Sequence, residues 1–76
     1  MIPERIQAAL DRYVSDHLPT GSFLRAVLED DIYCAARYAD ADSLKNLVDI
    51  VMLVREQPAE CHGSPDKVAA WLARRE

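Results

Sequence analysis

Apolar side chains recur every three or four residues through most of this chain, and clusters of proline, glycine and aspartate interrupt them at short intervals. This spacing places apolar side chains on one face of a helix. The 76 residues leave room for only one hydrophobic core. The pattern therefore predicts an all-α fold, a compact bundle of four to five short helices in a single domain over residues 1–76.

The interruptions predict where the first helices begin and end. One helix is expected over residues 3–17, because a proline is tolerated in a first turn. Thr20 or Ser22 is available to cap the next helix, whose apolar stripe runs over residues 23–38. Since acidic residues fall inside this stripe, we expect a break near Glu29, with Asp30 capping a second short segment over residues 31–39.

Two further helices are expected in the second half of the chain. The first spans residues 43–56, preceded by a cap-like cluster that includes Asp40 and Asp42. Between residues 47 and 54 only Asp49 is polar, which is more apolar surface than one buried stripe requires. This helix is thus either the central one or part of a protein–protein contact. The last helix begins after Ser64, which is followed by Pro65 and an acid, and points Lys67, Arg74 and Arg75 outward.

The aromatic residues are expected in the core, because aromatics at helical spacing in a small bundle are usually core residues and not a base-stacking set. They are Tyr13, Phe23, Tyr33, Tyr38 and Trp71.

The net charge of −4 is concentrated in residues 29–42. We call its five acids the acidic segment: Glu29, Asp30, Asp31, Asp40 and Asp42, against Arg37 alone. Acidic surfaces repel phosphate backbones and attract basic protein surfaces, so nucleic-acid binding is disfavoured and docking to a basic partner is allowed. A solvated face that keeps the protein soluble is the other interpretation.

Residues that could carry chemistry are few. Cys34, Cys61 and His62 show only half of a structural zinc site, without its usual ligand spacing. His17 is available as a fourth ligand, and a homo-oligomer could share ligands, but a buried thiol and a loop histidine are the favoured interpretation. A cysteine nucleophile would need an oriented base and an oxyanion hole, which the spacing does not indicate. The acids lack the alternating pattern and the glycine of a calcium loop. We therefore predict no enzyme activity, no metal and no cofactor.

Two alternative functions remain open. In a small-ligand binder, for a nucleotide or another anion, Thr20, Gly21 and Ser22 would hold the anionic group while Arg25 or Arg37 neutralises it. In a DNA-contacting regulator, the basic residues of the last helix would meet the phosphates, although the overall acidity opposes this.

No membrane span or secretion signal is expected. The longest apolar run, residues 50–54, is far short of the ~20 residues that cross a bilayer. The first residues lack the basic flank and apolar stretch of a signal peptide, and two cysteines do not make a disulfide scaffold. We expect a cytoplasmic protein.

Two motifs resemble those of a family of small uncharacterised proteins of tailed phages and prophages. The first, P-T-G-S-F-L-R-A-V-L-E-D-D-I from Pro19, is similar to the family pattern P-x-G-x-F-L-x-A-V-L-x-N-D-L, from which it departs at Asp30 and Ile32. The second, C-H-G-S-P-D-K-V-A-A-W from Cys61, is similar to C-W/H-G-S-P-E-K-V-x-x-W.

The resemblance implies a genomic setting and not a chemistry. In that setting we expect a phage-encoded accessory interaction protein in the host bacterial cytoplasm. It would bind or inhibit, stoichiometrically, a host or anti-phage defence component that has a basic surface. A homodimer is favoured over a monomer.

Overall fold

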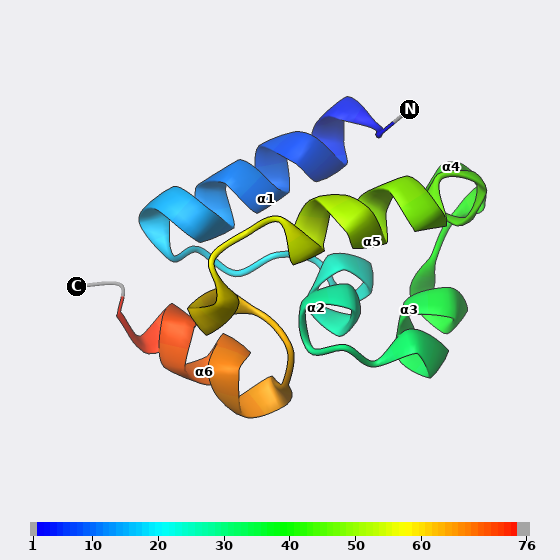
Figure 1. Ribbon diagram of the computed structural model, residues 1–76. Helices are drawn as coiled ribbons and strands as arrows, with labels where there is room; N and C mark the ends of the chain where they lie inside the picture. The colour runs from blue at the N-terminus through cyan, green and yellow to red at the C-terminus, as the bar shows by residue number, and fades with distance from the viewer. Residues whose placement is uncertain (1, 75–76) are drawn as a thin grey trace.

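Every regular element of the computed structural model is helical within residues 2–74, the part of the chain that the structure describes. The all-α prediction is therefore confirmed. These residues form six α-helices and one short 3-10 turn: α1 (Glu4–Asp16), α2 (Ser22–Leu28), α3 (Ile32–Tyr38), α4 (Ala41–Lys45), α5 (Leu47–Arg55), η1 (Ala59–Cys61) and α6 (Pro65–Ala73). Figure 1 shows how the labelled helices α1–α6 are arranged. Arg75, expected on the outer face of the last helix, lies outside the described residues.

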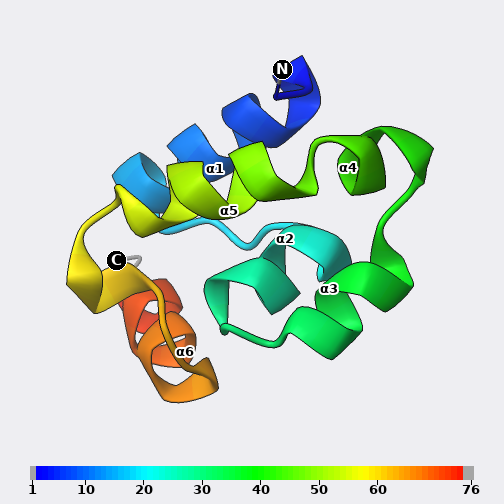
Figure 2. The same cartoon turned by 45° about the vertical axis from the view of Figure 1, so that its right-hand side comes forward.

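The helices are arranged around α2. Figures 1 and 2 show α1 and α5 side by side, with α2 and α3 beneath α5. Helix α6 lies toward the end of α5 that is farther from α4. Helix α2 packs against α3, α5 and α6, and five of its seven residues are buried. The central position that we considered for the helix over residues 43–56 thus belongs to α2.

The junction between α2 and α3 corrects the capping role predicted for Asp30. Asp30 adopts a left-handed conformation with φ of 63°, and its N–H donates to the carbonyl of Val27 at 3.1 Å. The N–H of Asp31 donates to the carbonyl of Ala26 at 2.9 Å, which completes a Schellman motif. Asp31, and not Asp30, then caps α3 by accepting the N–H of Cys34 at 3.1 Å. Asp30 ends one helix because short polar residues tolerate this conformation.

The helix predicted over residues 43–56 is two helices. Asp40, and not Asp42, is the N-cap, and its carboxylate accepts the N–H of Ser43 at 2.8 Å. The break falls at Asn46, whose side-chain amide donates to the carbonyl of Asp42 at 2.9 Å. An asparagine competes with the backbone for hydrogen bonds in this way, which accounts for one helix more than the sequence predicted.

The other predicted helix starts have mixed outcomes. Gly21 occupies the N-cap of α2 without a side-chain bond, so neither Thr20 nor Ser22 caps that helix. The cap of α6 is confirmed, since Ser64 accepts the N–H of Lys67 at 3.2 Å and Pro65 opens the helix.

Tertiary hydrogen bonds join the two ends of the chain. The Trp71 indole donates to the carbonyl of Tyr13 at 2.8 Å, and the Tyr13 hydroxyl donates to the carbonyl of Cys61 at 2.6 Å. His17 Nδ1 donates to the carbonyl of Trp71 at 2.9 Å, and the two rings contact each other at a tilt of 44° with centroids 4.4 Å apart. We call these four residues the α1–α6 clasp, because they connect the end of α1 to η1 and α6.

The aromatic core is smaller than predicted. Tyr13, Phe23 and Trp71 are buried, whereas Tyr33 is 73% exposed and Tyr38 is 54% exposed. Both tyrosines lie on α3, which buries only Ala35. The helical spacing of the aromatics was correct, but α3 packs mainly against α2 at the edge of the fold, and this contact leaves both tyrosines exposed.

The clasp predicts a selective effect of removing one hydroxyl. Tyr13→Phe leaves the Cys61 carbonyl without its donor inside the core, so the free energy of unfolding should fall by about 1–3 kcal/mol. Tyr33→Phe removes the same hydroxyl from a side chain that is 73% exposed and should change little. Chemical denaturation measures both, and an equal effect of the two variants would contradict the role of the clasp.

A second stability prediction concerns Gly63, which has φ of 116° and donates its N–H to the carbonyl of Leu28 at 2.7 Å. Because side chains are strained at this φ, Gly63→Ala should cost about 1–3 kcal/mol. Gly21→Ser is the matched control, since φ there is −74° and nothing lies within 4 Å of an added Cβ. Thermal unfolding should show a lower midpoint temperature for Gly63→Ala and not for Gly21→Ser. Equal decreases of the midpoint in the two variants would contradict the requirement for glycine at position 63.

Candidate functional site

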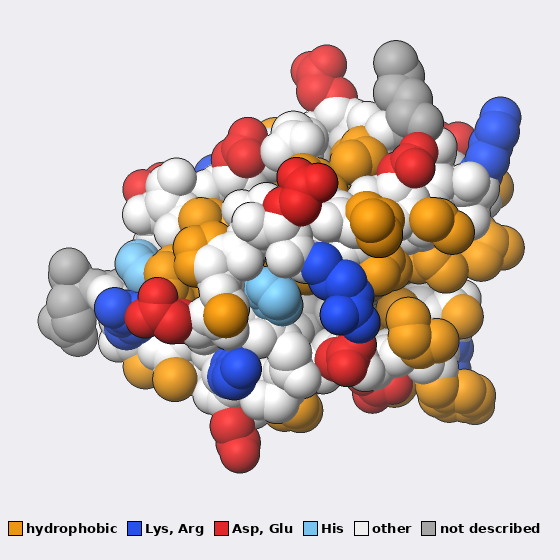
Figure 3. Space-filling view, in the orientation of Figure 1, with side chains coloured by type: hydrophobic (Ala, Val, Ile, Leu, Met, Phe, Trp, Pro, Cys, Tyr) orange, Lys and Arg blue, Asp and Glu red, His pale blue; other side chains and the backbone are white. Residues whose placement is uncertain are grey.

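Large apolar side chains gather on one side of the molecule and are exposed to solvent. Among the described residues six are between 54% and 74% exposed, and all belong to α3, α4 or α5: Ile32, Tyr33, Tyr38, Leu44, Val48 and Met52. We call this set the apolar face. Figure 3 shows hydrophobic side chains clustered on the right-hand side of the molecule, where these helices lie. Exposed patches of this kind mark interaction surfaces in monomeric proteins.

Helix α5 explains why apolar surface remains exposed. Ile50 and Val54 point into the core and are 0% and 2% exposed. Val48 and Met52 are two residues away from Ile50 in either direction, on the opposite side of the helix, and are 74% and 58% exposed. The surplus apolar surface predicted for this segment is thus exposed.

The negative charge of the protein lies on the same elements. Residues 29–56 contain seven acids and three bases, a balance of −4 that equals the net charge of the whole chain. The acids are Glu29, Asp30, Asp31, Asp40, Asp42, Asp49 and Glu56, and the bases are Arg37, Lys45 and Arg55. The rest of the chain is electrically balanced, so the apolar face is located in the acidic half of the protein.

The structure does not gather the acidic segment into one patch. Three acids lie at the α2–α3 junction and two at the α3–α4 junction, with α3 between them. Three of the five pair with arginines, and two of these arginines come from distant parts of the chain. Glu29 accepts from Arg25 at 2.9 Å, Asp30 lies 3.6 Å from Arg55 of α5, and Asp40 pairs with Arg5 of α1.

Two aspartates of the acidic segment cap helices, and the capping hydrogen bonds favour the ionised carboxylate. The backbone N–H of Cys34 lowers the pKa of the Asp31 carboxyl, and the backbone N–H of Ser43 does the same for the pKa of Asp40. Asp42 is exposed in the first turn of α4. Of the five acids, Asp42 is the one whose carboxylate forms no capping hydrogen bond or ion pair with another described residue. Its carboxylate is therefore available to a partner.

The residues of the small-ligand alternative are not brought together. Thr20, Gly21 and Ser22 lie at the start of α2, but Arg25 donates to Glu29 toward the other end of that helix. Arg37 lies in the last turn of α3. The structure therefore places no arginine from this set at the start of α2.

Neither cysteine is set up as a nucleophile. Burial raises the pKa of the Cys61 thiol, and the hydrogen bond with Asp31 raises the pKa of the Cys34 thiol. Both shifts reduce the thiolate, which is the reactive form. Within residues 2–74 no group of three His, Cys, Asp or Glu side chains is placed to hold a metal ion.

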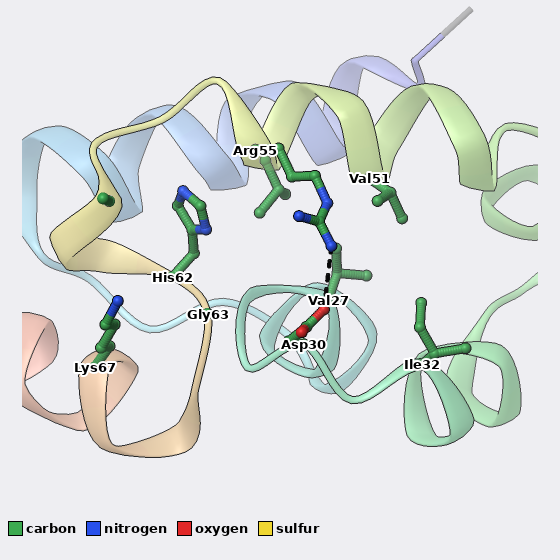
Figure 4. A pocket seen from close by; sticks show the side chains of 10 residues that line it. Val27, Asp30, Ile32, Val51, Arg55, His62, Gly63 and Lys67 are labelled. Carbon is green, nitrogen blue, oxygen red and sulfur yellow. Dashed lines mark ion pairs between the residues drawn. The ribbon is translucent and has the colours of Figure 1, made fainter.

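A pocket that sequence reasoning did not find lies between the α2–α3 junction, the end of α5 and the segment before α6. Its volume is about 170 Å³. Figure 4 shows Asp30 and Arg55 facing each other on one side and His62 and Lys67 on the other. These four residues come from three separate parts of the sequence, since only His62 and Lys67 are near each other, so no spacing rule could have connected them.

Comparison of the chain with protein-family models, with curated proteins and with solved structures found no match. Within the described residues, none of the helices has the length and apolar character needed to cross a membrane.

The two capping aspartates predict a sensitivity to acid. Their folded-state pKa values lie below the ordinary 3.8, so the ionised caps stabilise the fold above that pH and the contribution is lost as the pH falls through the lowered values. Asp31→Asn combined with Asp40→Asn keeps side chains that can cap but removes their charge. The melting temperature of this variant should fall less steeply than that of the natural protein between pH 5 and pH 2. Parallel curves would contradict the prediction.

Proposed function

We propose that this chain is an interaction protein that binds another protein stoichiometrically through the apolar face. The observation that carries the proposal is that all six exposed large apolar side chains lie on α3–α5, within the part of the sequence that holds the whole net charge of −4. Apolar surface supplies the binding free energy, and the surrounding charge selects the partner and steers its approach.

The expected partner has an apolar patch with basic residues around it. Lysines or arginines at the rim would complement Asp42 and the other acids beside the apolar face. A second copy of this chain would bring two acidic surfaces together, and we therefore favour a different protein over the homodimer. The sequence offered both the acidic segment and the surplus apolar side chains of residues 47–54 as contact surfaces. We now take the apolar face as the main contact, with the acids as its rim.

The motif resemblance supports a particular setting. Under this proposal the protein is a phage-encoded accessory factor that acts in the host cytoplasm and occupies a surface of a host or anti-phage defence component. Such an inhibitor needs a complementary surface and no catalytic apparatus.

Paired charge substitutions test the proposal. Val48→Lys combined with Met52→Lys places two cations on the apolar face, at side chains that are 74% and 58% exposed. The matched control, Ala69→Lys combined with Ala70→Lys, adds the same charge at exposed positions of α6. Tagged versions of all three proteins would be incubated with bacterial lysate, and the retained proteins identified by mass spectrometry.

We expect one basic partner to be retained by the natural protein and by the α6 control, and to be lost from the α5 variant by at least about tenfold. Retention should also weaken as salt is raised from 50 to 500 mM, because salt screens the charges at the rim. Equal retention by the α5 variant and the control would contradict the proposed surface. Analytical ultracentrifugation of the natural protein separately tests the homodimer predicted from the sequence.

A further inference from the structure

We propose that the pocket lined by Arg55 and Lys67 is a binding site for a compact carboxylate, with Lys67 as the cation that binds the carboxylate, Arg55 as a second positive charge on the facing side, and a small apolar body held by the pocket walls. The site lies beside the apolar face and shares Ile32 with it. Ligand binding in this pocket does not depend on whether the apolar face binds a protein.

The charge of the pocket favours an anion. Arg55 and Lys67 are its two formal cations, and His62 adds a ring that hydrogen-bonds through Nε2 to the carbonyl of Gln57 at 3.1 Å. Asp30 is the single carboxylate, and it lies 3.6 Å from Arg55. Lys67 forms no ion pair with any residue in the described part of the chain. One cation therefore remains for an incoming anion, on an otherwise acidic protein.

A backbone hydrogen bond holds one wall of the pocket in place. The N–H of Gly63 donates to the carbonyl of Leu28, which ties the segment before α6 to the end of α2. The Lys67 side chain lies over Gly63. A Cβ atom built on Gly63 would be 3.7 Å from Lys67 Nζ. Figure 4 shows Gly63 between Lys67 and Asp30. A site whose walls are already positioned loses little entropy when a ligand binds.

The size of the pocket limits the ligand. A volume of about 170 Å³ corresponds to the space of about five or six water molecules in the liquid. Pockets for drug-sized ligands usually start near about 300 Å³, so a whole nucleotide would not be enclosed. The walls include Val27, Val51 and Val54, which suit a branched or single-ring apolar body. A carboxylate on such a body matches both parts of the site.

Three probe molecules separate the contribution of the carboxylate from that of the apolar ring. Benzoate has both, benzamide has the same ring without the charge, and acetate has the charge without the ring. We expect benzoate to shift the backbone amide resonances of Arg55, His62 and Lys67 in a two-dimensional NMR titration, and to bind at least about threefold more tightly than either of the others. Equal binding of benzamide, equal binding of acetate, or shifts located away from these residues would overturn the proposal.

Three variants then test the assigned residues. Lys67→Gln should weaken benzoate binding by about three- to tenfold, because it removes one charge-assisted contact at a partly exposed site. Asp30→Asn should strengthen it by about threefold, since the competitor for Arg55 loses its charge and asparagine retains the left-handed backbone. Arg37→Gln removes one cation from an exposed position on α3 outside the pocket and should have no effect. Weaker binding by the Asp30 variant, or equal losses from Lys67→Gln and Arg37→Gln, would overturn the proposal.

Discussion

The hydrogen bonds between Tyr13, Trp71 and Cys61 are the interaction on which the rest of the structure depends. Within residues 2–74 no helix other than α1 exceeds nine residues, and isolated helices of that length are unstable in water. Their stability has to come from packing, and the clasp closes the chain by joining residues 48 and 58 positions apart. Burial strengthens this arrangement, because each polar group in the clasp has a partner in the core. Burial also raises the pKa of the Tyr13 hydroxyl, so this group stays protonated and can donate its hydrogen bond.

The clasp also determines where functional surface can exist. By fixing η1 against α1, it positions Gly63 to bond the free carbonyl at the end of α2, and this contact forms one wall of the charged pocket. With α1, α2 and α6 closing most of the core, α3 and α4 lie at the edge and have little left to bury. Their apolar side chains, with those on the outer side of α5, remain exposed. The apolar face therefore follows from which helices form the core.

Much of the fold could be predicted from the sequence, because helical periodicity and caps such as Ser64–Pro65 act locally. The errors arose where two local rules compete. Asp30 and Asp31 are both capable of capping, and only the Schellman geometry of the α2 end decides between them. Asn46 is compatible with helix continuation until its side chain bonds the Asp42 carbonyl. The exposure of Tyr33 and the assembly of Arg55, His62 and Lys67 into one pocket depend on tertiary packing, which periodicity does not contain. The second motif mostly encodes structure: Cys61, Gly63, Ser64 and Trp71 each have a stated role in the clasp, the α2 contact or the α6 cap.

The central claim is that an acidic, apolar surface on α3–α5 recognises a basic partner. The most direct measurement is an NMR map of amide shifts during titration with a short helical peptide that carries leucines on one face and lysines on the other. The same peptide with its residues shuffled to remove the helical face is the control. The account predicts shifts concentrated on residues 32–56, with small effects on the outer face of α6 and with weaker binding of the shuffled peptide. Shifts spread evenly over the molecule, or equal binding of the two peptides, would contradict it.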